Sequence, residues 1–369
     1  MPHKPIIAFA IGDPAAISPE LAVRVLAKHD EESATLLVLG DARVLDRGLL
    51  HANLEDAGLA GTIARVRPED IGTARPTRSV FVDLANCELD DVEIGVASVT
   101  GGRATLDNFR VALTAANEGF ADAVYFTPFN KHAMRLGEGN YVDEIGFVNR
   151  TIGAERSGSE FNVLDEVWNA RVTSHIPLAK VAESLNTDRI FRALQLTTEV
   201  MEGAGIQRPR IGVAALNPHA GDGRNFGTED EDIIFPAVER AKAHQLAVEG
   251  PIPSDTVFVR AVKGEFDAVL TMFHDQGQIA MKLIGFDRGV TLIAGYPFPI
   301  ATPAHGTAYD IAGKGIANDG AALKAIELAT RLARPASEAP EITKTFADAV
   351  QGTRAAAANA SISEGAPVH

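Results

Sequence analysis

The chain has 369 residues, more than one typical domain needs, so a body of two domains is expected. Hydrophobic residues make up 46% and charged residues 22%, as in a soluble enzyme with a full-sized core. The net charge of −15 argues against nucleic acid or an anionic membrane as a partner. The lone Cys87 excludes a disulfide framework, and the apolar start at residues 6–11 is too short for a signal peptide or a membrane span. We therefore expect a cytoplasmic protein.

Short β-branched runs alternate with amphipathic stretches rich in Ala and Leu, which is the pattern of an α/β fold. The expected strands, in chain order, are residues 6–11, 35–39, 79–84, 123–126, 210–216 and 268–273, with an extended stretch at 161–174. Helices are expected from about residue 19 and over residues 103–118. Residues 334–369 have little apolar periodicity, so we expect a loosely attached C-terminal extension there.

Three of the expected extended segments end in a histidine: His175, His219 and His274. Ligands bind at the carboxyl ends of strands in open α/β sheets, because the loops that follow the strands converge there. Taken singly, each histidine is a better candidate for a structural role than for a metal ligand. Taken together, three imidazoles from three loops would form a divalent-metal site with open positions for substrate. A dehydrogenase uses such an ion to acidify a hydroxyl and to polarise the carbonyl that forms.

A loop of small residues at 305–318 resembles the adenosine-binding loop of the NAD-dependent β-decarboxylating dehydrogenases, the isopropylmalate and isocitrate dehydrogenase group. The resemblance implies that NAD is the cofactor. An Asp in such a loop accepts hydrogen bonds from both ribose hydroxyls and repels a 2′-phosphate, so Asp310 favours NAD over NADP. The alternative is a plain Gly-rich loop that caps a helix. The candidate cofactor-binding residues in it are His305, Gly306, Thr307, Ala308, Asp310 and Asn318.

Motifs along residues 6–333 resemble, in order, those of the 4-hydroxythreonine-4-phosphate dehydrogenase family of pyridoxal phosphate biosynthesis. Ala16 and Ser18 stand where glycines are usual in the opening motif. The matching segments are residues 12–21, 127–131, 173–178, 216–221, 250–256, 273–277 and the 305–318 loop.

This resemblance implies a two-domain α/β/α subunit of the isocitrate and isopropylmalate dehydrogenase type, with the active site in the interdomain cleft. We expect residues 1–130 plus 290–333 to form one domain, residues 131–289 to form the other, and residues 334–369 to form the extension. The resemblance also implies that the chain works as a homodimer. The resemblance makes His175, His219 and His274 the ligands of a divalent cation, with zinc first and magnesium, manganese or cobalt as alternatives.

The substrate motifs depart from the family pattern. A Gly-His-Thr-Glu motif that helps the family hold a phosphorylated substrate is missing, and Asp143 and Glu144 lie in its place, where they would repel a phosphate. The family's substrate-binding Lys corresponds to Lys282. Its substrate-binding Asn and Arg correspond to Thr291 and Ile300, so the substrate clamp is altered.

Two enzyme interpretations follow. The chain is either a 4-hydroxythreonine-4-phosphate dehydrogenase with a rearranged pocket, or a paralogue that acts on another diol or hydroxy acid, such as a terephthalate dihydrodiol dehydrogenase. Both oxidise a secondary alcohol beside a carboxylate-bearing carbon, and the β-keto acid then loses CO₂ readily. A non-catalytic ligand-binding paralogue is a further alternative.

Lys282 and Asp255 are the candidate base and acid. Lys282 lies eight residues after His274, and a bound cation would lower its pKa towards neutrality. Asp255 either orients a ligand histidine or caps a helix. Asn130 and Lys131 either face the nicotinamide or have a plain loop-capping role.

Overall fold

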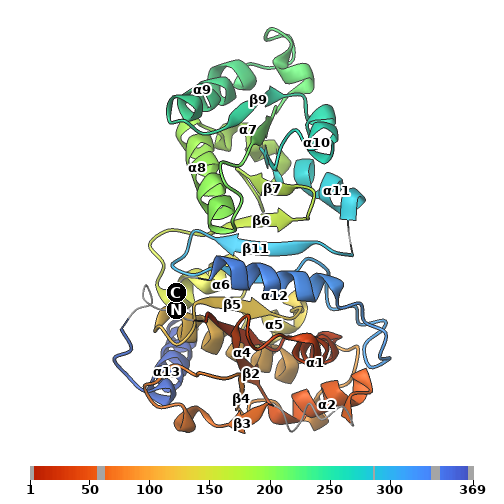
Figure 1. Cartoon of the computed structure of the whole chain (residues 1–369), viewed down its shortest axis with the longest axis vertical. Helices are drawn as coiled ribbons and strands as arrows, with labels where there is room; N and C mark the ends of the chain where they lie inside the picture. The colour runs from red at the N-terminus through yellow and green to blue at the C-terminus, as the bar shows by residue number, and fades with distance from the viewer. Residues whose placement is uncertain (1–3, 56–62, 286, 334–340, 365–369) are drawn as a thin grey trace, which may run out of the picture. The chain divides into compact units, whose positions relative to one another are not determined.

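The computed structural model describes residues 4–55, 63–285, 287–333 and 341–364, and it divides into two compact α/β units (Figure 1). Unit 1 contains residues 1–158 and 295–369, and unit 2 contains residues 159–294. The expected fold class, α/β with two bodies, is confirmed. Within the described residues, no helix has the length and apolarity needed to cross a membrane.

Unit 1 contains a parallel sheet with the strand order β3-β4-β2-β1-β5-β12. Its two central strands are completely buried, as expected for a parallel sheet with helices on both faces. One helical layer is built by α4, α5, α6 and α13, and the other by α1, α2 and α12. The strands are β1 (Ile6–Ala10), β2 (Thr35–Gly40), β3 (Ala64–Val66), β4 (Val80–Asp83), β5 (Ala123–Phe126) and β12 (Ile300–Pro303), and the helices are α1 (Ser18–Lys28), α2 (Ala42–Ala52), α4 (Val99–Asn117), α5 (Lys131–Gly137), α6 (Glu144–Ile152), α12 (Gly320–Leu332) and α13 (Phe346–Glu364).

Unit 2 contains strands in the order β11-β6-β7-β10-β8-β9, of which β7, β10, β8 and β9 run parallel. The expected stretch at 161–174 is instead an antiparallel pair, β6 and β7, with a turn between them. The strands are β6 (Ser159–Val163), β7 (Trp168–Arg171), β8 (Ile211–Ala214), β9 (Val248–Ile252), β10 (Ala268–Thr271) and β11 (Val290–Ala294), and the helices are α7 (Val181–Ser184), α8 (Thr187–Gly203), α9 (Phe235–Ala243), α10 (Ser254–Val262) and α11 (His274–Gly285).

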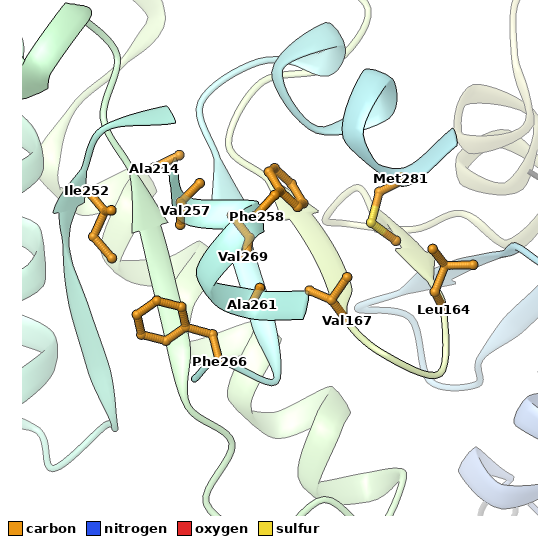
Figure 2. Packing of buried hydrophobic residues seen from close by; sticks show 10 residues of the cluster. All are labelled: Leu164, Val167, Ala214, Ile252, Val257, Phe258, Ala261, Phe266, Val269 and Met281. Atoms are coloured by element: carbon orange, nitrogen blue, oxygen red, sulfur yellow. The ribbon is translucent and has the colours of Figure 1, made fainter. Parts of the chain in front are cut away.

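An apolar cluster forms the part of the unit 2 core that lies beneath α10 and α11 (Figure 2). Its ring and thioether side chains, Phe258, Phe266 and Met281, are each less than a tenth exposed. Burying such side chains contributes about 1.5–3 kcal/mol each. This packing holds α11, which begins at His274, against β7 and β10.

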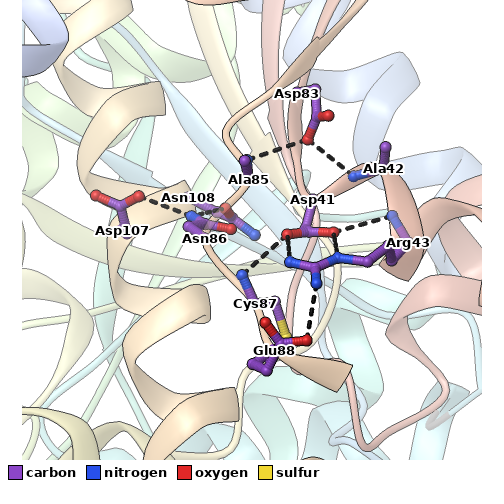
Figure 3. A network of polar contacts seen from close by, with 10 residues as sticks. All are labelled: Asp41, Ala42, Arg43, Asp83, Ala85, Asn86, Cys87, Glu88, Asp107 and Asn108. Carbon is purple, nitrogen blue, oxygen red and sulfur yellow. Dashed lines mark hydrogen bonds and ion pairs between the residues drawn. The ribbon is translucent and has the colours of Figure 1, made fainter. Parts of the chain in front are cut away.

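A polar network ties together the loops at the carboxyl ends of β2 and β4 in unit 1 (Figure 3). The Asp41 carboxylate accepts the backbone N–H of Arg43 and of Cys87, each at 2.9 Å. Burial raises the pKa of Asp41, but the hydrogen bonds from Arg43 and Cys87 outweigh it and bring that pKa below its usual range. Burial raises the pKa of the Cys87 thiol to about 12, so the lone cysteine is an inert core residue.

The domain boundaries differ from those expected. Residues 131–158 belong to unit 1, whereas we expected them to open the second domain. The reason is that α5 and α6 pack on α4, where Phe109 stacks on Phe147 with ring centroids 5.4 Å apart. Unit 2 extends to Ala294 because β11 pairs with β6.

The C-terminal extension is not loosely attached over its described part, which corrects that expectation. Helix α13 packs on α4 of unit 1. Phe346 is 1% exposed and meets Phe120 edge-on at 5.2 Å, while Arg354 forms an ion pair with Asp107. Residues 334–340 and 365–369 of the expected extension lie outside the described residues.

The close approach of α4 and α5 generates a stability prediction. A Cβ at Gly102 would lie 1.8 Å from the carbonyl oxygen of Ala133, so the backbones must separate in Gly102→Ala. We expect a loss of about 1–3 kcal/mol in the free energy of unfolding, measured by urea denaturation. The control is Gly352→Ala on α13, where a Cβ would meet no described atom within 4 Å. Equal effects of the two substitutions would contradict this account of the packing.

Candidate active site

The structure brings His175 and His274 together at the carboxyl ends of two neighbouring parallel strands. Strand β7 pairs with β10 in a register that sets Arg171 opposite Thr271. The pairing continues past the strands, since the Thr173 N–H donates to the Met272 carbonyl at 3.1 Å. As a result, the imidazole centroids of His175 and His274 lie 5.7 Å apart.

The side chain of His274 is oriented by its neighbours. Nδ1 of His274 lies 2.6 Å from Oδ1 of Asp275, which leaves Nε2 as the nitrogen available to a ligand. Gln276 ties this turn to the loop after β8, because its amide accepts the Met272 N–H and donates to the Ala215 carbonyl. Asp275 therefore orients the His274 ring, and Gln276 holds the turn from which His274 projects.

His219 follows β8 in a turn with left-handed backbone, at φ 53°, and its side chain is exposed. The start of this loop is held by the buried Asp230, which accepts the N–H of Leu216 at 2.8 Å and of Asn217 at 3.1 Å. Among the described residues, no group of three or more His, Cys, Asp or Glu side chains is arranged to hold a metal. The structure therefore joins two of the three predicted ligands, and the part played by His219 stays a prediction.

The candidate base and acid lie on two helices of unit 2. Lys282 is exposed on α11, about 12 Å along the helix from His274. Asp255 is exposed in the first turn of α10. The helix-capping alternative for Asp255 is wrong, because the N-cap residue is Pro253. Thr291 lies on β11 directly opposite Asn162 of β6.

The acidic residues that replace the phosphate motif both have structural partners in unit 1. Asp143 caps α6 by accepting the Gly146 N–H at 2.8 Å. Glu144 forms an ion pair with Lys131 at 3.0 Å, so its charge is partly offset. Asn130 caps α5, which agrees with the capping alternative that we gave for it.

Three motifs that are far apart in the sequence meet in unit 1. The N–H of Gly12 donates to the Thr127 hydroxyl at 2.9 Å, which joins the 12–21 and 127–131 motifs. The N–H of Ile17 donates to the Thr307 carbonyl at 3.2 Å, and the Tyr309 hydroxyl donates to the Asp13 carboxylate. Burial raises the pKa of Asp13, although the bond from Tyr309 opposes the rise. These contacts anchor the start of the 305–318 loop.

The end of the 305–318 loop is held from α1. Glu20, fully buried, accepts the N–H of Ala317 at 3.0 Å and forms an ion pair with Arg24. Arg24 also donates to the Gly315 carbonyl at 2.8 Å. Gly315 has φ 70°, and a Cβ there would lie 2.6 Å from the His51 carbonyl oxygen, so the loop requires glycine at this point.

The candidate cofactor residues are distributed along this loop. Asp310, Gly306 and Asn318 are exposed, and the Asn318 side chain accepts the Gly320 N–H at the start of α12. Nε2 of His305 is buried and has no hydrogen-bond partner among the described residues. Burial lowers the pKa of His305, so its ring is neutral near pH 7.

Ile300, a candidate substrate-binding residue, is 0% exposed and lies in β12, where it pairs with Val124 of β5. Its side chain is part of the core of unit 1, and this corrects the expected role.

Sequence reasoning missed three groups in these sites. Asp13 and Glu20 lie inside a motif that we quoted, but nothing local showed that they would reach residues almost 300 positions away. The buried Arg171 carried a weak signal, since polar residues alternate along β6 and β7.

Comparisons with known proteins agree with this architecture. Residues 32–329 match the family model described as pyridoxal phosphate biosynthetic protein PdxA. A relative from Rhizobium meliloti, named as a 4-hydroxythreonine-4-phosphate dehydrogenase, is 53% identical and covers 90% of this chain and 94% of its own. A relative from Oceanobacillus iheyensis, named as a D-threonate 4-phosphate dehydrogenase, is 33% identical over 90% of this chain and 99% of its own.

Two solved structures extend the comparison. A 4-hydroxythreonine-4-phosphate dehydrogenase from Burkholderia phymatum has a TM-score of 0.72 and 33% identity, over 89% of this chain and 98% of its own. A terephthalate 1,2-cis-dihydrodiol dehydrogenase from Burkholderia xenovorans has a TM-score of 0.63 and 27% identity, over 89% and 98%. The expected class, an oxidoreductase of the dehydrogenase type, is confirmed by these relatives. The chain belongs to the PdxA family.

The contacts of Glu20 generate a prediction. Glu20→Ala removes the acceptor for Ala317 and leaves Arg24 without its carboxylate, so we expect the free energy of unfolding to fall by about 1.5–3 kcal/mol. The control is Lys28→Ala, which removes an exposed pair with Asp319 and is expected to cost less than about 1 kcal/mol. Urea denaturation of both variants measures the difference, and equal losses would show that Glu20 does not hold the loop.

Proposed function

We propose that this protein is a metal-dependent, NAD-linked dehydrogenase that oxidises a secondary alcohol next to a carboxylate-bearing carbon, with loss of CO₂ from the product. The observation that carries the proposal is the pair of imidazoles, His175 and His274, at the ends of β7 and β10. Ligands of α/β proteins bind at this edge of the sheet. The family to which the chain belongs supports the same reaction class.

The two imidazoles suit a shared divalent cation. With metal–nitrogen bonds of about 2.0–2.1 Å, two rings on one zinc ion have centroids about 5–6 Å apart. The centroids of His175 and His274 are 5.7 Å apart, and the Asp275 contact leaves Nε2 of His274 available. We propose His219 as the third ligand and zinc as the ion, with magnesium, manganese or cobalt as alternatives. A cation bound there would acidify the substrate hydroxyl and polarise the carbonyl that forms from it.

The 305–318 loop is proposed to bind the adenosine of NAD. Its two ends are held by Asp13 and Glu20, so the exposed Asp310 is presented on an ordered backbone. The buried Nε2 of His305 has an unmet hydrogen bond that a ligand would satisfy. Gly306, Thr307, Ala308 and Asn318 remain the proposed neighbours of the cofactor, together with Asn130 and Lys131.

The chain's own residues supply the proton transfers in this proposal. Lys282 takes the proton of the substrate hydroxyl as the C–H hydride passes to the nicotinamide. The C–C bond to the carboxylate then breaks, CO₂ leaves, and Asp255 delivers a proton to the carbon that carried it. Thr291 is proposed to contact the substrate.

The substrate is proposed to be a hydroxy acid, either phosphorylated as in the relatives' names or a non-phosphorylated diol acid. The pairing of Glu144 with Lys131 weakens the repulsion that we expected against a phosphate. A dihydrodiol acid is the second candidate, supported by the structural likeness to the terephthalate dihydrodiol dehydrogenase.

We further propose a homodimer that works in the cytoplasm. Ile279 and Leu283 are 62% and 83% exposed one turn apart on α11, and a second copy of the chain would cover such an apolar strip. The buried Cys87 agrees with a reducing compartment.

The activity is tested with a substrate panel and with Zn²⁺, Mn²⁺, Mg²⁺ or Co²⁺ supplied. The panel contains 4-hydroxythreonine 4-phosphate, D-threonate 4-phosphate, their dephosphorylated forms and a terephthalate cis-dihydrodiol. We expect reduction of NAD⁺ with at least one acid, and loss of that activity on treatment with a chelator. Absence of turnover on the whole panel with every metal would favour the non-catalytic ligand-binding alternative.

Asp310 generates a prediction about the cofactor. We expect kcat/KM to favour NAD⁺ over NADP⁺, because the Asp310 carboxylate repels a 2′-phosphate. In Asp310→Lys, the ratio of the two kcat/KM values should move towards NADP⁺ by roughly tenfold or more. The control is Glu32→Lys, the same charge change at an exposed position of unit 1. A preference for NADP⁺ in the unsubstituted protein would refute the assignment.

A further inference from the structure

A buried polar cluster lies on the face of the unit 2 sheet that packs against α11. We define it as Glu160 and Asn162 of β6, Asn169 and Arg171 of β7, and Gln278 of α11. Asn162 and Asn169 are directly paired, and Arg171 bonds to Asn162, so the β6 and β7 side chains share one face. The amide of Gln278 donates to the Asn162 side chain at 2.9 Å, which closes the cluster against α11.

Arg171 is only partly satisfied within this cluster. Its side chain is 2% exposed. The Nη2 amino group donates to the Asn162 amide oxygen at 2.7 Å and to the Glu160 carboxylate. Nε and Nη1 are also buried, and neither has an acceptor among the described residues. A guanidinium is always charged and carries five donors, so this arrangement leaves a buried cation with unmet hydrogen bonds.

One acceptor of the cluster is in use, whereas another, Oδ1 of Asn169, is buried without a donor among the described residues and forms no hydrogen bond with Arg171. The Asn162 oxygen accepts from both Arg171 and Gln278. Glu160 is 18% exposed, so water screens its charge more than it screens that of Arg171. Neither amide oxygen bonds to Nε or Nη1 of Arg171, so we expect the acceptors for these two groups to come from outside the cluster.

The position of Arg171 points to the active site. Arg171 is the last residue of β7, four residues before His175, and Thr291 lies two strands away on β11, opposite Asn162 of β6. Ser174, between Arg171 and His175 in the chain, also has a buried hydroxyl without a partner among the described residues. Two residues with unmet hydrogen bonds, Arg171 and Ser174, thus lie within the four positions that precede a proposed metal ligand.

We infer that Arg171 is a substrate-binding residue, and that its Nε and Nη1 groups bind an anionic oxygen of the acid substrate. This inference rests on the proposed function, because it adds a recognition residue to the same site. The shared chemistry is that of an oxyanion, which either a carboxylate or a phosphoryl group supplies. Guanidinium groups bind both through charge-assisted hydrogen bonds.

The first test measures anion binding without cofactor or turnover. Isothermal titration uses malonate as the carboxylate probe and inorganic phosphate as the phosphoryl probe. The variant is Arg171→Met combined with Glu160→Gln, so that no carboxylate is left buried without its partner. The matched control is Arg210→Met with Asp267→Asn, which removes an exposed guanidinium–carboxylate pair of the same unit.

We expect the unsubstituted protein to bind one probe, and the anion that binds identifies the group that Arg171 recognises. Its dissociation constant should rise roughly 10- to 100-fold in the Arg171 variant and stay unchanged in the control. Binding of neither probe by the unsubstituted protein, or equal binding by the variant and the control, would overturn the inference.

The second test uses Arg171→Lys with a panel substrate that the unsubstituted protein oxidises. A lysine keeps the charge but loses the planar fork. We expect KM to rise roughly tenfold with a smaller change in kcat, whereas a residue that only holds the β6–β7 pair would lower the melting temperature and leave KM unchanged. If the Arg171 variant loses anion binding but the unsubstituted protein oxidises no panel substrate, the result counts against the proposed function. If the unsubstituted protein oxidises a panel substrate but the Arg171 variant binds the anion normally, the result counts against Arg171 as a substrate-binding residue.

Discussion

The candidate active site depends on the parallel pairing of β7 with β10. Parallel neighbours in register end at the same edge of a sheet, so the residues that follow them must meet. This is why His175 and His274, almost a hundred residues apart in the chain, have rings 5.7 Å apart. The apolar cluster beneath α10 and α11 then holds α11 in place, and α11 begins with His274 itself.

Much of this could be predicted from the sequence, because strands buried on both faces read as continuous apolar runs. The runs that form β1, β2, β5 and β10 were located correctly, and so were the strand-end positions of His175 and His274. The place of residues 131–158 could not be predicted, because it depends on the packing of α5 and α6 against α4. The expectation of a loosely attached extension was wrong for α13. This helix has little apolar periodicity, but Phe346 and Arg354 attach it to unit 1 through a ring contact and an ion pair.

The contacts that organise the sites are long-range and polar, which is why local patterns missed them. Tyr309 bonds to Asp13, and Ala317 bonds to Glu20, across almost 300 residues of chain. No periodic pattern in the sequence indicates that such residues pair. Buried groups with unmet hydrogen bonds are likewise visible only in three dimensions, and those of His305 and Arg171 lie in segments for which we propose ligands.

The central claim is that His175 and His274 share one divalent cation, and a metal analysis of the purified protein tests it most directly. Bound zinc, magnesium, manganese and cobalt would be measured by plasma mass spectrometry in the unsubstituted protein and in the His175→Ala, His219→Ala and His274→Ala variants, with His244→Ala as the control. The account predicts about one equivalent of metal in the unsubstituted protein and the control, and loss of most of it in the His175 and His274 variants. A full equivalent retained when either histidine is removed would contradict it.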